Sequence, residues 1–313
     1  MVDSQFKSDV LAGLTGPRRA IPARWFYDER GSELFDDITH LTEYYPTRVE
    51  TEILENSRID IAARVGTGRA VIEFGAGSAT KTPLLLDAVA PTAYIPIDIS
   101  GDYLRDAAAA LQAKFPALPV YPVEADFTNG MELPDAVDDL PRLGFFPGST
   151  IGNFIPRSGV DMLRHMRGIL GEGAMLLIGF DRIKPLEVLI PAYDDASGVT
   201  AAFNLNLLER INRELDGNIP VHAFAHQAIW NDIEARIEMH LEATCDVGFV
   251  VGGRRFEIAQ GETIHTENSH KYDLRSLRML LRAGGWSPVE EYSDPHDWFT
   301  LVLAEAKPFH NAP

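Results

Sequence analysis

Short apolar runs alternate with helical segments along the first half of the chain, beginning at the glycine turn of residues 69–82. The later apolar runs cover residues 93–98, 120–123, 143–146 and 174–180, and helical patterns occupy residues 101–115 and 161–170. Continuous apolar runs of this length, bounded by glycines or polar loops, are typical of buried parallel strands. Strands that alternate with helices in this way predict a doubly wound α/β sheet.

The pattern changes at about residue 183. A long amphipathic helix over residues 199–215 is followed by short strand-like runs at 221–230, 234–241, 247–251 and 256–258. The Gly252-Gly253 pair between the last two runs is typical of a hairpin. We therefore expect an inserted, mostly antiparallel α+β unit. Alternation then resumes with a helix at 274–283 and a strand at 298–304.

The turn after the first strand indicates a nucleoside cofactor. Gly75 and Gly77 allow the backbone to turn tightly and to approach a ligand closely. Asp98 follows about 20 residues later, where an acid can accept both hydroxyls of a ribose. A dinucleotide-binding turn has a third small residue where this chain has Thr80. The pattern therefore favours S-adenosylmethionine over a cofactor with a pyrophosphate.

Several predicted strands are followed by glycine or by polar side chains. Gly75, Asp98, Asp126 and Asn153 each lie at or just after the end of such a strand. Because the carboxyl ends of parallel strands meet at one edge of a sheet, these residues predict a ligand site at that edge. Glu73, near the end of the first strand, is expected to face a cationic ligand.

The composition disfavours several classes of partner. The 313 residues are 45% hydrophobic, enough for a full core, and carry a formal net charge of −18. This charge disfavours phosphate backbones and anionic lipids, so we expect neither nucleic acid nor membrane as a partner. No apolar run is long enough to span a membrane, the first residues do not resemble a signal peptide, and Cys245 is the only cysteine. These features predict a cytoplasmic enzyme without an internal disulfide.

The sequence shows little sign of nucleophilic or metal chemistry. Ser100 and Ser149 follow strands but lack the glycines of a nucleophile elbow, and Cys245 has no flanking catalytic signature. His222 and His226 are a close histidine pair, but no acidic residue lies between them in a zinc-binding pattern. We therefore expect no metal ion and no covalent nucleophile.

Six segments, in order along the chain, resemble one enzyme family. They are residues 26–35 (FYDERGSELF), 43–48 (EYYPTR), 73–77 (EFGAG), 148–153 (GSTIGN), 192–200 (AYDDASGVT) and 266–269 (TENS). Together they resemble the L-histidine Nα-methyltransferases, which form hercynine for ergothioneine biosynthesis. The resemblance extends from about Pro22 to Ala304.

The resemblance implies a fold and a division into domains. A Rossmann-like core of a class I S-adenosylmethionine-dependent methyltransferase would comprise residues 49–183 and 271–313. An inserted α+β substrate-binding domain would comprise residues 1–48 and 184–270. The enzyme would be a monomer that trimethylates the α-amino group of L-histidine.

The resemblance also implies a set of cofactor-binding residues. They are Tyr44, Gly75, Lys81, Asp98, Asp126 and Phe127. Asp98 would bind the ribose hydroxyls. Asp126 would accept from the adenine amino group, and Phe127 would supply its backbone amide. Tyr44 and Lys81 would hold the methionine carboxylate.

Three further residues are implied as catalytic. The hydroxyl of Tyr27 and the carbonyl of Gly148 would hydrogen-bond the α-amine of the substrate. Phe35 would offer a π face to the nitrogen as it becomes cationic. Catalysis would then consist mostly of orienting a neutral amine toward the sulfonium methyl group.

The residues implied for substrate binding suit histidine. They are Asn153, Tyr193, Thr200, Met239, Glu267 and Ser269. Asn153 and Tyr193 can donate to the α-carboxylate. Glu267 can accept from an imidazole N–H, and Ser269 can bond the other ring nitrogen. Met239 would pack on the imidazole ring, and Glu267 would set the specificity.

Other functions stay open at this point. Ser149 and Asn268 replace a glycine and an apolar residue that are common in the family. Because Asn268 lies between Glu267 and Ser269, another amino acid such as tryptophan is an alternative substrate. A catalytically silent S-adenosylmethionine-binding protein is a second alternative, which the complete amine-facing set disfavours. A nicotinamide dehydrogenase is a third alternative, which Thr80 disfavours.

Overall fold

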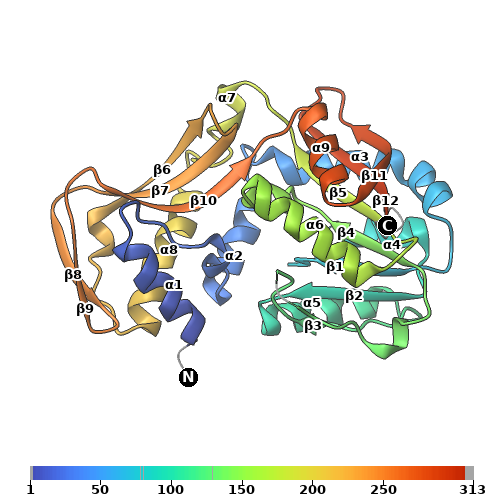
Figure 1. Cartoon of the computed structure of the whole chain (residues 1–313), viewed down its shortest axis with the longest axis horizontal. Coiled ribbons are helices and arrows are strands. Elements are labelled where there is room, and N and C mark those ends of the chain that lie inside the picture. Colours follow the sequence, from blue (N-terminus) through green and yellow to red (C-terminus); the bar gives the residue numbers. More distant parts are fainter. Residues whose placement is uncertain (1–2, 78, 80, 129, 307–313) are drawn as a thin grey trace, which may run out of the picture. The chain divides into compact units, whose positions relative to one another are not determined.

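The chain divides into two units (Figure 1). The computed structural model describes residues 3–77, 79, 81–128 and 130–306. The smaller unit consists of Met1–Tyr45 and Lys184–Ser269, and the larger unit of Pro46–Ile183 and His270–Pro313. The units therefore part after residues 45, 183 and 269, beside the domain boundaries expected after residues 48, 183 and 270.

A seven-stranded sheet forms the centre of the larger unit, in the order β11-β12-β5-β4-β1-β2-β3. Its strands are β1 (Ala70–Phe74), β2 (Ala93–Asp98), β3 (Val123–Glu124), β4 (Arg142–Phe146), β5 (Met175–Asp181), β11 (Trp286–Ser293) and β12 (Phe299–Ala306). Strands β1 to β5 pair in parallel, whereas β12 is antiparallel to β5 and β11. The predicted α/β fold with a Rossmann-like parallel core is confirmed.

Helices cover this sheet. They are α3 (Tyr45–Val65), α4 (Thr82–Val89), α5 (Gly101–Lys114), α6 (Pro156–Leu170) and α9 (Leu274–Ala283), with short 3-10 turns η2 (Asp135–Val137) and η3 (Thr150–Asn153). Helices α6 and α9 pack side by side (Figure 1), and Met166 and Leu281 on them are fully buried against apolar strand residues. Trp286 is buried beside them and donates its indole N–H to the carbonyl of Leu163 (2.9 Å). The core therefore accommodates its largest ring without an unpaired polar group.

The smaller unit combines helices with antiparallel strands. Its elements are α1 (Ser4–Thr15), η1 (Ala23–Phe26), α2 (Glu29–Thr39), α7 (Leu186–Leu189), α8 (Val199–Glu214), η4 (Val221–Ala223), β6 (Phe224–Asn231), β7 (Arg236–Ala243), β8 (Val247–Val251), β9 (Arg254–Ile258) and β10 (Thr263–His270). Strands β10, β7 and β6 form one sheet in that order, and β8 pairs with β9. Helix α8 contacts both α2 and the β6–β7 hairpin. Among the described residues, no helix is both long and apolar enough to cross a membrane.

The predicted Gly252-Gly253 hairpin is confirmed. These residues join β8 to β9 with φ angles of +56° and +81°. Both angles lie in the left-handed region, which glycine adopts without the steric cost of a Cβ.

Several elements are not predicted by the sequence pattern, among them α1, β10 and β11. The last two lie at the edges of their sheets and are rich in polar residues. An edge strand also tolerates Pro288, which would disrupt the hydrogen bonds of a central strand. The run expected at 120–123 differs as well, because β3 begins at Val123 and Val120 forms only an isolated bridge with Tyr94.

Candidate functional site

The turn after β1 brings three backbone segments of the larger unit together. Gly75 and Gly77 have φ angles of +72° and +50°, which glycine adopts readily. The amides of Gly75 and Ala76 donate to the carbonyl of Ile97 in β2 at 2.9 and 3.0 Å. A Cβ added to Gly75 would lie 3.4 Å from the ring of Phe127. Two residues predicted to bind the cofactor, Gly75 and Phe127, therefore meet at this edge of the sheet.

Asp98 ends β2 with its carboxylate toward the same turn. Its Oδ2 accepts the amide of Gly77 at 3.0 Å, and its Oδ1 accepts the amide of Ser100 at 2.9 Å. Burial raises the pKa of the Asp98 carboxyl, and the two amides partly oppose this rise. Each oxygen has a second lone pair, so the carboxylate can also accept the two hydroxyls of a ribose. The turn and this acceptor therefore fit the nucleoside part of S-adenosylmethionine.

From its position in the sequence, Glu73 was expected to face a cationic ligand. In the structure its carboxylate instead bonds two hydroxyls within the larger unit. Glu73 is 2% exposed, and its Oε2 accepts from Tyr94 at 2.6 Å and Thr82 at 2.7 Å. Burial raises the pKa of Glu73 to about 7, although the bonds from Tyr94 and Thr82 lower it in part. Its side chain therefore ties β1 to β2 and to the start of α4, which corrects the expectation.

Asp126 and Phe127 follow β3. Oδ1 of Asp126 accepts the amide of Thr128 at 2.9 Å and its hydroxyl at 2.5 Å, which fixes the loop. The ring of Phe127 packs edge-on against Phe74 and Phe146, with centroids 6.2 and 5.8 Å away. These contacts fix the ring of Phe127 beside the glycine turn.

A buried carboxylate that the sequence pattern did not single out joins two predicted residues. Glu50 on α3 is 0% exposed and forms an ion pair with Lys81. Its Oε2 also accepts the amide of Gly148 at 2.9 Å. An ammonium group has three donors, so Lys81 can bond a ligand carboxylate as well as Glu50. The Gly148 amide is occupied, and among the described residues no backbone or side-chain donor bonds its carbonyl.

Asn153 is the last residue of η3 and is half-buried. Its side chain has no hydrogen-bond partner within the described ranges, so the amide can serve a ligand. Ser149, one of the departures from the family pattern, has a structural role because its Oγ accepts the amide of Asp181 at 2.9 Å. Thr80 lies outside the described residues.

Aromatic rings of the smaller unit form one cluster. Phe35 of α2 lies edge-on to Tyr27 and Tyr44, with centroids 5.7 and 6.3 Å away. Phe203 of α8, which the sequence pattern did not single out, packs against Tyr27 and Phe35 at 5.8 and 6.0 Å. The cluster brings the predicted catalytic residues Tyr27 and Phe35 together with Tyr44.

Tyr193 and Ser269 extend this cluster with a polar contact. Their hydroxyl oxygens lie 2.7 Å apart, and both residues are buried. The ring of Tyr193 also meets that of Tyr44 edge-on at 6.3 Å. Two residues predicted to bind different parts of histidine are therefore hydrogen-bonded to each other.

Thr200 lies in the first turn of α8. The carboxylate of Asp195 accepts the amides of Val199 and Thr200 at 3.1 and 2.8 Å, which caps this helix. Burial raises the pKa of Asp195, but the hydrogen bonds from Thr200 and Val199 outweigh it and lower the pKa overall. Thr200 is 3% exposed. Its amide takes part in the capping of the helix.

Met239 and Glu267 lie on neighbouring strands. Met239 of β7 is 2% exposed, and its carbonyl accepts the hydroxyl of Thr266 at 3.0 Å. The carbonyl of Glu267 accepts from Nε2 of His265 at 2.9 Å. Burial of alternate residues along β10 breaks down at Glu267 and Asn268, which are both half-buried. The side-chain Oδ1 of Asn268 is buried without a hydrogen-bond partner among the described residues.

The two histidines of the pair noted in the sequence have different surroundings. His222 is exposed, whereas His226 bonds the amide of Asn204 and the carbonyl of Tyr193, both at 2.8 Å. Burial lowers the pKa of His226, so its neutral form is favoured. The structure instead brings together three other side chains of metal-ligating types: Glu238, His240 and His265.

The predicted residues thus form groups within each unit. In the larger unit, Gly75 and Phe127 meet beside Asp98, and Lys81 and Gly148 meet at Glu50. In the smaller unit, Tyr27, Phe35, Tyr44, Tyr193 and Ser269 form one connected cluster. Among the described residues, the side chains of Asn153 and Thr200 have no hydrogen bond to another predicted site residue.

Residues 6–306 match the family model of S-adenosylmethionine-dependent, histidine-specific methyltransferases. The chain is 40% identical over 304 residues to the histidine N-alpha-methyltransferase of Mycolicibacterium smegmatis, an alignment that covers 95% of this chain and 94% of the relative. It is 38% identical to the histidine N-alpha-methyltransferase of Mycobacterium tuberculosis, with the same coverage of 95% and 94%. Ergothioneine biosynthesis protein 1 of Schizosaccharomyces pombe is 27% identical over 93% of this chain and 40% of its own length.

Proposed function

The chain belongs to the S-adenosylmethionine-dependent, histidine-specific methyltransferase family, and from this premise we propose that it trimethylates the α-amino group of L-histidine. The product would be hercynine, and the reaction the first step of ergothioneine biosynthesis. The observation that carries this proposal is the 40% identity, over 95% of the chain, to a relative named histidine N-alpha-methyltransferase. The name of the fission-yeast relative, ergothioneine biosynthesis protein 1, supports the same pathway.

S-adenosylmethionine, when bound, supplies an electrophilic methyl group on a sulfonium sulfur. We assign the ribose hydroxyls to Asp98, whose oxygens each already accept one backbone amide. We assign the adenine amino group to Asp126 and the methionine carboxylate to Lys81 and Tyr44. The pair with Glu50 fixes the position of the Lys81 ammonium group.

The chain must orient a neutral amine and accept its protons. We assign the hydrogen bonds to this amine to the hydroxyl of Tyr27 and the carbonyl of Gly148. Phe35 would stabilise the nitrogen as it becomes cationic, and its edge-on contacts with Tyr27 and Tyr44 fix its ring. Orientation of this kind can lower a barrier by on the order of 7–11 kcal/mol. After the third transfer the nitrogen is quaternary, so the reaction ends there.

We assign recognition of the amino acid to polar side chains and one methionine. Asn153 and Tyr193 would donate to the α-carboxylate. Glu267 and Ser269 would bond the two imidazole nitrogens, with Met239 packed on the ring. The hydrogen bond between the hydroxyls of Tyr193 and Ser269 (2.7 Å) holds the two side chains together. A larger apolar substrate would bind more tightly if the Glu267 carboxylate were absent. The presence of this carboxylate therefore favours histidine as the substrate.

Mass spectrometry on a substrate pool tests this function. Purified enzyme is incubated with S-adenosylmethionine and an equimolar mixture of the twenty amino acids. We expect histidine alone to gain methyl groups. Methylation of another amino acid would overturn the substrate, and methylation of none would favour a catalytically silent cofactor-binding protein.

We further propose that the enzyme acts as a cytoplasmic monomer on the free amino acid, without nucleic acid or membrane partners. The net charge of −18 supports the absence of anionic partners. Size-exclusion chromatography with light scattering should give the mass of one 34.6 kDa chain. A mass twice as large at all protein concentrations would contradict the monomer.

A further inference from the structure

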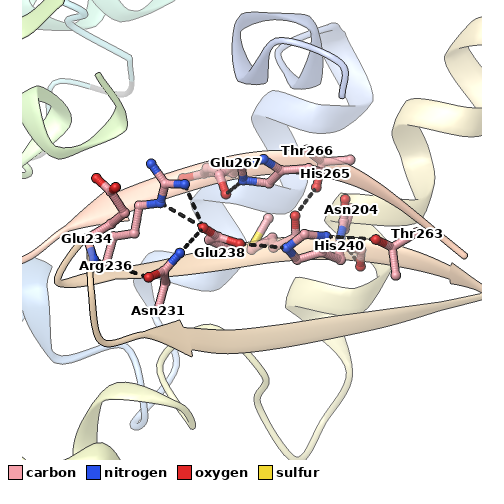
Figure 2. Close-up of polar contacts among 11 residues, drawn as sticks. Asn204, Asn231, Glu234, Arg236, Glu238, His240, Thr263, His265, Thr266 and Glu267 are labelled. Carbon is pink, nitrogen blue, oxygen red and sulfur yellow. Dashed lines mark hydrogen bonds and ion pairs between the residues drawn. The ribbon is translucent and has the colours of Figure 1, made fainter. Parts of the chain in front are cut away.

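Three side chains of metal-ligating types lie together on the three-stranded sheet of the smaller unit. Glu238 and His240 belong to β7 and His265 to β10, and each offers a ligand atom within 4.8 Å of the other two. Glu238 and His240 are two residues apart in a strand and therefore share one face (Figure 2). Two imidazoles and a carboxylate form a frequent ligand set for Zn²⁺ and related ions. The proposed methyl transfer gives none of these three side chains a role.

Glu238 is held by hydrogen bonds on the side away from the histidines (Figure 2). Its Oε1 accepts the side-chain amide of Asn231 at 2.8 Å and two guanidinium N–H groups of Arg236 at 2.8 and 2.6 Å. Its Oε2 lies 3.0 Å from Nε2 of His240. Metal ligands usually have outer hydrogen bonds of this kind, which fix their orientation. Asn231 and Arg236 therefore engage one oxygen and leave the other oriented toward the histidines.

His240 can present a lone pair to a metal ion and keep its outer bond. Its Nδ1 lies 3.2 Å from the hydroxyl of Thr263. Because a carboxylate only accepts, Nε2 carries the hydrogen when it faces Glu238, and Nδ1 accepts from Thr263. A metal ion between Nε2 and Glu238 would move the hydrogen to Nδ1. The Thr263 hydroxyl can then accept it, since a hydroxyl both donates and accepts.

His265 is fixed in the tautomer that a metal site requires. Its Nε2 lies 2.9 Å from the carbonyl oxygen of Glu267. A carbonyl only accepts, so Nε2 carries the hydrogen and the lone pair of the neutral ring lies on Nδ1. Across the part of the chain that the structure describes, Nδ1 has no hydrogen-bond partner. The ring stacks on His240 with centroids 4.7 Å apart and planes 16° from parallel.

We propose that Glu238, His240 and His265 bind one divalent transition-metal ion, for which Zn²⁺ is the appropriate probe. Three protein ligands leave at least one coordination position for water. No step of the proposed methyl transfer uses the ion. Because His265 also bonds the main chain of Glu267, the ion would fix the strand beside that residue. An ion that binds only the folded protein also stabilises it by mass action.

Calorimetric titration of Zn²⁺ into tag-free, EDTA-treated enzyme tests the proposal. We expect one ion per chain, and we expect His240→Gln and His265→Gln each to weaken binding at least about tenfold. His222→Gln is the matched control, because His222 is exposed and outside the group, and it should bind as the wild type does. Zn²⁺ should raise the Tm of the wild type and of this control more than that of the two variants.

Absence of one-to-one binding would overturn the proposal, as would equal affinity in the wild type and the two variants. If the variants do not fold, X-ray absorption of the Zn²⁺-loaded wild type replaces them. Two imidazole nitrogens at about 2.0–2.1 Å would support the site, and a shell of oxygen atoms alone would overturn it. No methyl donor or amino acid is present in these experiments, so their outcome does not depend on the methyltransferase activity.

Discussion

The predicted site residues of the two units are held in position in different ways. In the larger unit the backbone does most of the positioning, since Gly75 has a left-handed φ of +72° and two amides hold Asp98. In the smaller unit side chains position one another, as Phe35 does with Tyr27 and Tyr193 does with Ser269. A site held by backbone groups depends on a few irreplaceable residues, whereas a site held by side-chain contacts can be retuned by substitution.

The largest effect should follow removal of the Asp98 carboxylate. Asp98→Ala should weaken binding of S-adenosylhomocysteine at least about 100-fold, because two charge-assisted hydrogen bonds are lost at about 1.5–3 kcal/mol each. Calorimetric titration measures this affinity. Asp102→Ala is the control, because the Asp102 side chain is fully exposed nearby on α5. Equal affinities of the two variants would contradict the ribose assignment.

Glu73→Gln should change how the free energy of unfolding depends on pH. The pKa of Glu73 is about 7 in the folded state against 4.5 for an ordinary glutamate. Between these values the unfolded chain has released a proton that the folded chain keeps, so this group lowers stability as pH rises toward 7. Glutamine does not titrate, so the variant should gain on the order of 2–3 kcal/mol relative to wild type between pH 4.5 and 8.

Urea unfolding of both proteins across this pH range measures the difference. Glu55→Gln is the control, because Glu55 is exposed on α3 of the same unit. If the free energies of unfolding of wild type and Glu73→Gln differed by the same amount at all pH values, the folded protein would not raise the pKa of the Glu73 carboxyl.

Glu267→Ala tests the site residues of the smaller unit, which are positioned by contacts between side chains. This change should raise the KM for histidine about tenfold or more and leave the affinity for S-adenosylhomocysteine unchanged, since an imidazole N–H loses a charged acceptor. Steady-state kinetics and a cofactor titration separate the two effects. Glu234→Ala, an exposed glutamate in the turn between β6 and β7, is the matched control. Unchanged histidine kinetics would instead favour a different natural amino acid.

The smallest effect should come from a methyl group at the glycine turn. Gly75→Ala should lower the free energy of unfolding by about 1 kcal/mol, because φ of +72° is strained for any residue with a Cβ. Gly168→Ala, in helix α6 with open space around its Cβ position, should stabilise by up to about 1 kcal/mol. Urea unfolding compares them. Equal shifts of the same sign would show that backbone geometry does not restrict Gly75.

Much of the larger unit could be predicted from sequence because its signals are local. The apolar run of β2 was predicted with its observed bounds, Ala93–Asp98, and the glycine turn lies beside it. Glu50 could not be predicted in this way. Its carboxylate accepts the amide of Gly148, 98 residues away, and an acidic residue on a helix gives no local sign of burial.

In the smaller unit, the local pattern of apolar residues predicts less of the structure. Strand β10 is polar and lies at a sheet edge, so neither its pairing nor the approach of His265 to His240 appears in the pattern of apolar residues. The close spacing of His222 and His226 in the sequence is not matched by similar surroundings, because His222 is exposed and His226 is hydrogen-bonded to the carbonyl of Tyr193. Contacts between residues far apart in sequence need the structure to reveal them.

The central claim, trimethylation of the histidine α-nitrogen, is tested most directly by a stoichiometric time course. Enzyme, L-histidine and S-adenosylmethionine are combined, and fragmentation mass spectrometry locates each methyl group while S-adenosylhomocysteine is counted. We predict mono-, di- and trimethylated species in succession, all labelled on the α-nitrogen, with three molecules of S-adenosylhomocysteine formed for each final product. Methyl groups on the imidazole ring, or a reaction that ends after one transfer with S-adenosylmethionine in excess, would contradict the account.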